Sequence, residues 1–312
     1  LPFDPGDLSA YHLGLYSLTG SVGLLANTTP HHALLVYSQI INAMAGLAAF
    51  ILLDKILGRL PAIAGMVFVS FISFQPALYF NWGRFPQLVA QTSLLPSALL
   101  FWYSLEEATK QNTQIKDPKR FNWVIPAILS ALTISATALI HFRVAAFYLP
   151  LLILLFLFSI LSKSKSANQR KRILFQTIAI AFMSLLFMVP ALIPGLNTYL
   201  NPTTTAVENL NETYQTYANA TLKDIPFYLF EYSEFFNIGL TKGISILVLL
   251  SLLFGLCFKK TRFIALIAIF WTFSLWLIGS LPALNIPKLA IVNMTGVMIL
   301  AYLPGGLAFA VL

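Results

Sequence analysis

Charged residues and cysteine are both scarce in this sequence. Charged residues make up 10% of the chain and hydrophobic residues 58%, whereas a soluble domain is typically about 25% charged. The composition therefore excludes an ordinary soluble domain and indicates an integral membrane protein. The single cysteine, Cys257, excludes a disulfide within the chain and belongs to no zinc or redox motif.

Acidic residues are outnumbered, since 11 Asp and Glu stand against 19 Lys and Arg. The basic residues lie in short segments between apolar runs rather than in one basic stretch. The excess charge therefore does not indicate binding to nucleic acid. Membrane lipids are the expected surroundings of such a chain.

Long apolar runs predict an all-α fold, a polytopic bundle of about nine transmembrane helices. The run from 124 to 161 is about twice as long as one span needs. His141 and Arg143 interrupt it, and a cation is costly at mid-membrane. We therefore expect two antiparallel spans joined by a polar turn at 141–143, at a membrane surface. The expected spans are 32–54, 61–80, 86–108, 122–141, 144–162, 173–194, 242–258, 263–281 and 289–311.

Basic residues predict the orientation of the bundle. They concentrate in alternate loops, and the positive-inside rule makes those loops cytoplasmic. The turn at 141–143 is then external. The loops with most of the positive charge contain Lys55 and Arg59; Lys110, Lys116, Lys119 and Arg120; Lys163, Lys165, Arg170, Lys171 and Arg172; and Lys259, Lys260 and Arg262.

The organisation expected is a single transmembrane domain over 1–312. An external loop (1–31) precedes spans over 32–194, and a large external loop (195–241) separates these from spans over 242–312. Residues 8–25 predict a juxtamembrane amphipathic helix. Its expected apolar face consists of Leu8, Tyr11, Leu15, Leu18, Val22 and Leu25. The sequence begins at Leu1 and ends in an apolar run, so we expect a segment of a longer protein.

Cations mark the external starts of several predicted spans. The N-terminus of a helix carries partial positive charge, so a cation there is unfavourable unless an anion binds. Arg84 and Arg143 are the better candidates for a phosphate site, since a guanidinium matches phosphate oxygens. The alternative is that such side chains extend to lipid headgroups, and it applies most to Lys242 and Lys288.

Acidic residues near the external face are candidates for a general base. Asp4 and Asp7 precede the predicted juxtamembrane helix, and Asp7 could instead cap it. Glu231 and Glu234 are weaker candidates, because a solvated helix face also explains them. Four polar residues within spans are expected to face the bundle interior, namely Gln39, Asn42, Gln87 and Gln91.

All four histidines are predicted to be external: His12, His31, His32 and His141. Together with Asp4 or Asp7 they could form a metal site, but their spacing matches no standard motif. Hydrogen bonding at the interface is the alternative. A divalent metal therefore stays open, and no metal ligand is assigned.

The sequence resembles the GT-C superfamily in several features. They are Asp7 in the first external loop with Tyr11 after it, the juxtamembrane helix, the large later external loop and the turn Asn81–Pro86. The superfamily consists of polytopic membrane glycosyltransferases, and the resemblance is to bacterial and archaeal families related to protein mannosyltransferases and lipid A sugar transferases. Paired acids are common in that loop, whereas Asp4 and Asp7 are separated here, which leaves metal use open.

The resemblance implies transfer of a sugar from a polyprenyl-phosphate donor to a lipid, glycan or protein on the extracytoplasmic face of the cell membrane. Asp7, with Asp4 nearby, would deprotonate the acceptor. Arg84, Arg143 and His141 would hold the donor phosphate. Substrate contacts would come from Tyr11, His12, Glu231 and Glu234.

A membrane scaffold subunit without catalytic activity, or a transporter, is the alternative function. A transporter commonly has ionisable groups in mid-span and inverted repeats. Here the charges lie at predicted helix ends, and no repeat is visible, which favours the enzyme over a transporter. A scaffold stays open.

Overall fold

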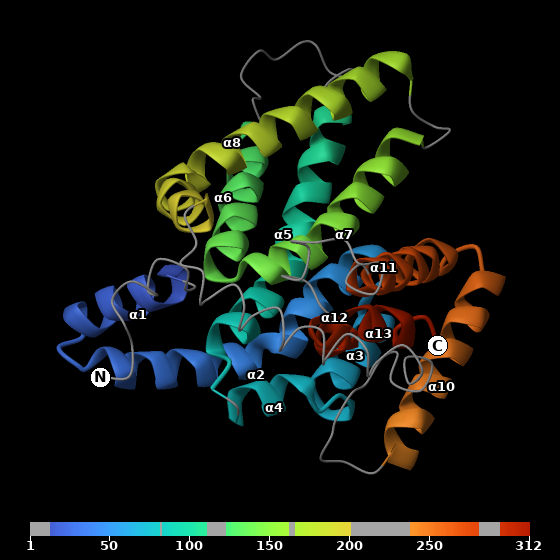
Figure 1. Cartoon of the computed structure of the whole chain (residues 1–312). Coiled ribbons are helices and arrows are strands. Elements are labelled where there is room, and N and C mark those ends of the chain that lie inside the picture. The colour runs from blue at the N-terminus through green and yellow to red at the C-terminus, as the bar shows by residue number, and fades with distance from the viewer. Residues whose placement is uncertain (1–12, 82, 111–122, 162–165, 201–237, 281–293) are drawn as a thin grey trace.

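The structure is a computed structural model that describes residues 13–81, 83–110, 123–161, 166–200, 238–280 and 294–312. Every regular element within these ranges is helical (Figure 1). The elements are α1 (Leu13–Leu25), α2 (Pro30–Leu57), α3 (Arg59–Val67), the π-helical turn η2 (Phe68–Ile72), α4 (Gln75–Asn81), α5 (Phe85–Lys110), α6 (Val124–Ile140), α7 (Phe142–Leu161), α8 (Ala167–Leu200), α10 (Ile238–Cys257), α11 (Arg262–Ser280), α12 (Met294–Leu300) and α13 (Tyr302–Phe309).

Five helices are long and apolar enough to cross a membrane, which supports a multi-pass membrane protein. They are Pro30–Leu57, Phe85–Thr109, Phe142–Leu161, Ala167–Pro190 and Arg262–Ser280. The predicted span 122–141 appears as the shorter helix Val124–Ile140, and the predicted span 242–258 falls within α10. Nine spans of full length are therefore not observed in the described part of the chain.

The predicted span 61–80 is not one straight helix. It divides into α3, η2 and α4, because the backbone becomes extended at Ser73. The Ser73 N–H donates to the Phe68 carbonyl at 2.8 Å, a wide turn that ends the first segment. The Ser73 hydroxyl then accepts from the Gln75 N–H at 3.3 Å, and Pro76 suits the first turn of α4 because that position needs no N–H.

Contacts between distant segments show which helix ends lie together. Gln169 at the start of α8 donates from Nε2 to the Thr109 carbonyl at the end of α5 (3.3 Å). Near the start of α11, the ring of Phe263 lies 5.0 Å from that of Phe158 on α7. Three of the predicted cytoplasmic loops therefore begin or end at one end of the bundle, as their alternation required.

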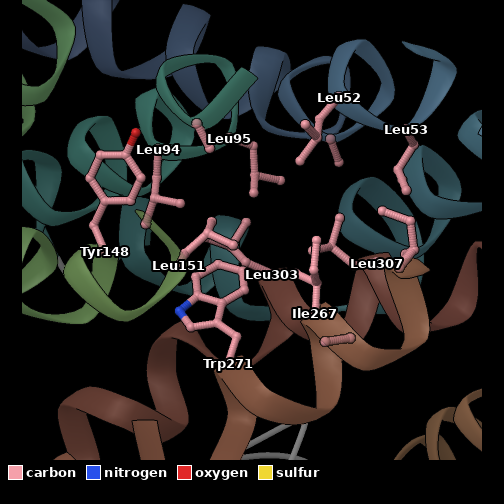
Figure 2. Packing of buried hydrophobic residues seen from close by; sticks show 14 of the residues in the cluster. Leu52, Leu53, Leu94, Leu95, Tyr148, Leu151, Ile267, Trp271, Leu303 and Leu307 are labelled. Atoms are coloured by element: carbon pink, nitrogen blue, oxygen red, sulfur yellow. The ribbon is translucent and has the colours of Figure 1, made fainter. Parts of the chain in front are cut away.

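The core lies where α2, α5, α7, α11 and α13 meet (Figure 2). Trp271 on α11 is fully buried, and its indole N–H donates to the Phe147 carbonyl on α7 at 3.0 Å. Small residues bring α13 close to α3, since a Cβ added to Gly65 would lie 3.1 Å from the Gly306 carbonyl oxygen. This packing is typical of membrane helices, which approach closely through small residues.

The face through which α1 packs on the protein coincides only at Leu15 with the apolar face predicted for the juxtamembrane helix. Helix α1 begins at Leu13, and its buried line consists of Leu15, Thr19 and Gly23. Leu18 and Val22 are exposed. The physical reason is that α1 packs on α2 and α6, where small side chains permit close contact, while leucine and valine are stable facing lipid.

Candidate functional site

The turn between α6 and α7 consists of a single non-helical residue, His141. Its backbone is extended, with φ −159° and ψ 100°. The His141 N–H donates to the Thr137 carbonyl (3.0 Å), and its carbonyl accepts from the Ala145 N–H (3.2 Å). His141 therefore ends one helix and begins the next, which makes the turn tighter than the predicted three residues.

The His141 side chain is buried, although the sequence placed it at a membrane surface. It is 6% exposed, and its Nδ1 atom is inaccessible, as is the Nε atom of Arg143. Arg143 lies in the first turn of α7 and is half-buried. A titratable ring and a guanidinium are thus held between helices, at the start of a predicted span.

Helix α1 lies against this turn. A Cβ added to Gly14 would stand 2.8 Å from the Leu139 carbonyl oxygen and 3.0 Å from the Ile140 backbone nitrogen. Only glycine allows such an approach without a shift of backbone atoms. The first turn of α1 is therefore packed directly on the last turn of α6, two residues before His141.

Arg84 stands immediately before α5, as predicted. Its carbonyl accepts from the Leu88 N–H at 3.1 Å, so it caps the helix with its backbone. Gly83 supplies a positive φ of 68° in the turn that precedes it. The Arg84 side chain is exposed, and Pro86 lies in the first turn of α5 as the sequence suggested.

Two side-chain hydrogen bonds fix the register of α5 against α6. The Ser97 hydroxyl donates to Thr133 Oγ1 at 2.9 Å, and the Ser93 and Thr137 hydroxyls lie 3.0 Å apart. Moving four residues forward on α5, from Ser93 to Ser97, corresponds to moving four residues backward on α6, from Thr137 to Thr133, so the two helices are antiparallel. One further turn brings His141 to the level of Val89.

The register places the Arg84 turn and the His141 turn at the same end of the bundle. Arg84 precedes Val89 by five residues, which is about 7.5 Å along a helix axis. Arg143 lies two residues after His141, in the first turn of α7, and α7 also packs on α5. The structure thus gathers the predicted phosphate-binding residues Arg84, His141 and Arg143 from neighbouring elements at one end.

Sequence reasoning missed the hydroxyl network beneath this end. Tyr148 donates to Ser97 Oγ at 2.9 Å, and Ser97 donates in turn to Thr133. Serines and threonines four residues apart on two successive predicted spans, 93 and 97 against 133 and 137, were the available signal. The network fixes the helices that carry His141 and Arg143.

The predicted interior amides have different outcomes. Gln87 and Gln91 are buried, as expected, and Gln91 Oε1 accepts from the Tyr302 hydroxyl at 3.2 Å. Gln39 is exposed, so its expected interior position is wrong, and Asn42 is half-buried. Arg84, Gln87 and Gln91 lie on one face of α5. A line of polar side chains therefore runs from the start of α5 into the interior of the bundle.

Six predicted site residues lie outside the described part of the chain. They are Asp4, Asp7, Tyr11, His12, Glu231 and Glu234. Among the residues that are described, no group of three or more His, Cys, Asp or Glu side chains could hold a metal ion.

No protein-family model and no curated protein matches the sequence. A solved structure is similar in its helix arrangement. It is the archaeal oligosaccharyltransferase AglB from Archaeoglobus fulgidus, in complex with an inhibitory peptide and a dolichol-phosphate, with a TM-score of 0.47 and 14% identity. The match covers 96% of this chain and 41% of that one. A likeness of this degree concerns helix arrangement, and no residue role is transferred from it.

Proposed function

We propose that this chain is the transmembrane part of a GT-C-type glycosyltransferase, which transfers a sugar from a polyprenyl-phosphate donor on the extracytoplasmic face. The observation that supports it best is the approach of Gly14 to Leu139. It ties the start of α1, which follows Asp7 in sequence, to the turn that carries His141 and Arg143. The described segment that follows Asp7 in sequence thus adjoins the turn assigned to phosphate binding, which supports the proposal.

Asp7 is close enough in sequence to take part. It precedes Leu13 by six positions, and six residues of extended chain span at most about 20 Å. In the proposed reaction its carboxylate takes the proton of an acceptor hydroxyl, whose oxygen attacks the anomeric carbon of the sugar. The bond from that carbon to the donor phosphate oxygen breaks, and the polyprenyl phosphate leaves with the electron pair.

Arg84 and Arg143 are proposed to stabilise the negative charge that grows on the leaving phosphate. Arg143 is the half-buried member, and electrostatic stabilisation is strongest where water is excluded. His141 would fix the turn and contribute a ring N–H. Asp4, Tyr11, His12, Glu231 and Glu234 are proposed to contact the acceptor or the sugar.

Turnover of a polyprenyl-phosphate sugar by the full-length protein in proteoliposomes tests this function. We expect Asp7→Asn to lower kcat at least 100-fold, because general-base catalysis contributes about 10² to 10⁴. Arg84→Gln and Arg143→Gln should each lower kcat/KM by about 10² or more. Lys242→Gln, at another predicted external helix start, is the matched control and should change turnover less than twofold.

The outcomes separate the enzyme from its alternative. Undiminished turnover in Asp7→Asn would remove that residue as the base. A wild-type protein that is folded but transfers no sugar from any polyprenyl-phosphate donor would favour a membrane scaffold without catalytic activity. Equal losses in Lys242→Gln and the arginine variants would show a general charge effect rather than a phosphate site.

A further inference from the structure

Consecutive cations open α8 at the opposite end of the bundle from His141. Arg170, Lys171 and Arg172 lie in its first two turns, and the first turn contains no acidic residue. None of the three forms a salt bridge within the described part of the chain. Because a helix N-terminus is itself partially positive, these cations stand where positive charge is unfavourable unless an anion binds.

The backbone of this turn is held rigidly. The Ser166 N–H donates to Gln169 Oε1 (2.8 Å), and the Gln169 N–H donates to Ser166 Oγ (3.3 Å), which forms a capping box. Gln169 Nε2 also donates to the Thr109 carbonyl on α5. The cations are therefore presented from a fixed turn, at little cost in backbone entropy on binding.

The three side chains differ in exposure. Arg170 and Lys171 are exposed, whereas Arg172 is half-buried and its Nη1 atom is inaccessible with no hydrogen-bond partner among the described residues. A buried guanidinium donor that lacks an acceptor is costly. The turn thus combines accessible positive charge with an unsatisfied donor on its inner side.

An exposed apolar stripe continues from Lys171 along α8. Positions 171, 174, 175, 178 and 182 share one face of the helix. Phe175 is 64% exposed and Phe182 61%. The opposite face of α8 packs through Ile173, Gln176 and Ile180, which are buried. The stripe is therefore the side of α8 that faces the hydrocarbon of the bilayer.

We propose that the outer face of α8 binds one anionic phospholipid, with its phosphate at Arg170–Arg172 and its acyl chains along the stripe from Leu174 to Phe182. Charge complementarity decides the headgroup, because an anionic phosphate satisfies both the cations and the helix N-terminus. The stripe favours a lipid over free phosphate as the source, because acyl chains attached to a phosphate at this turn would lie along it. The inference is independent of the proposed catalytic function.

Native mass spectrometry of the full chain, released from bilayers of phosphatidylglycerol and phosphatidylcholine, tests the proposal. The wild-type protein should retain one phosphatidylglycerol. The double variant Arg170→Gln/Lys171→Gln should retain at least fivefold less. The matched control is Lys259→Gln/Lys260→Gln, which removes two exposed cations from the turn between α10 and α11 and should retain the lipid as the wild type does.

A second pair of variants tests the acyl-chain half of the site. Phe175→Ser/Phe182→Ser should also lower retention, with an unchanged Tm in pure phosphatidylcholine showing that α8 is folded. Equal losses in both cation pairs would overturn the proposal in favour of general surface attraction. The proposal would also be overturned if millimolar inorganic phosphate displaced the lipid, or if the phenylalanine variant retained as much phosphatidylglycerol as the wild type. A bound mass equal to a second chain, in place of the lipid, would overturn it too.

Discussion

Gln91 places an amide in the interior of the bundle. Its side chain is fully buried, its Oε1 accepts from the Tyr302 hydroxyl, and its Nε2 has no partner among the described residues. One level outward, Leu88 and Ile299 form a small apolar cluster that Ile41 and Phe80 cover. The hydrogen bond between Gln91 and Tyr302 therefore links α5 to α13 in the interior of the bundle. If either side chain is removed there, no water is at hand to replace it as a hydrogen-bond partner.

Tyr302→Phe should lower the free energy of unfolding by about 0.5–1.5 kcal/mol, because it leaves a second atom of the Gln91 amide unsatisfied. Gln91→Met should cost less, since it removes an unsatisfied donor together with the acceptor. The double variant should show a coupling energy of about 0.6 kcal/mol or more. Reversible unfolding in mixed detergent micelles measures all three, and additive effects would rule out the link.

Helix α1 shows why a helix face is hard to predict in a membrane. The spacing of Leu15, Leu18 and Val22 predicted one apolar face on a helix at the membrane interface. In lipid, burial brings no hydrophobic gain, and contact is decided by how closely backbones approach. The buried line through Leu15, Thr19 and Gly23 follows from this rule.

Gly14→Ala and Gly20→Ala form a matched pair on this helix. The added methyl at Gly14 would press on the Leu139 backbone at 2.8 Å, whereas at Gly20 nothing lies within 4 Å. Gly14→Ala should destabilise the protein by about 1–3 kcal/mol, and Gly20→Ala should be neutral or stabilise it by up to about 1 kcal/mol.

Thermal unfolding in detergent measures both glycine variants. If the approach of α1 to α6 matters for catalysis, sugar transfer by Gly14→Ala should also fall at a temperature where the variant is folded. Equal Tm values for the two variants would show that α1 does not press on the end of α6.

At the scale of the whole molecule, the sequence predicted the helical class, the long spans and the grouping of basic loops at one end. These features follow from composition and from local periodicity, both of which can be read directly from the sequence. It also predicted that Arg84 precedes a helix and that a turn joins two spans at His141. The break at Ser73 and the burial of His141 depend on packing between distant segments, which no local pattern encodes.

The orientation of the bundle is a prediction that the chain's own chemistry can test. Cys257 is the single cysteine, it is exposed, and it ends α10 beside Lys259 and Lys260. The positive-inside rule places this end of the span at the cytoplasmic surface. His31, exposed in the first turn of α2, is predicted to be external.

A membrane-impermeant maleimide applied to intact cells should therefore leave the wild-type protein unlabelled until the membrane is permeabilised. In a Cys257→Ser background, His31→Cys should react with the intact cells, and Lys259→Cys should react after permeabilisation alone. The reverse pattern would put Arg84, His141 and Arg143 on the cytoplasmic side. A polyprenyl-phosphate donor on the outer face could not reach them there, so the proposed reaction would be excluded whatever the residues' mutual geometry.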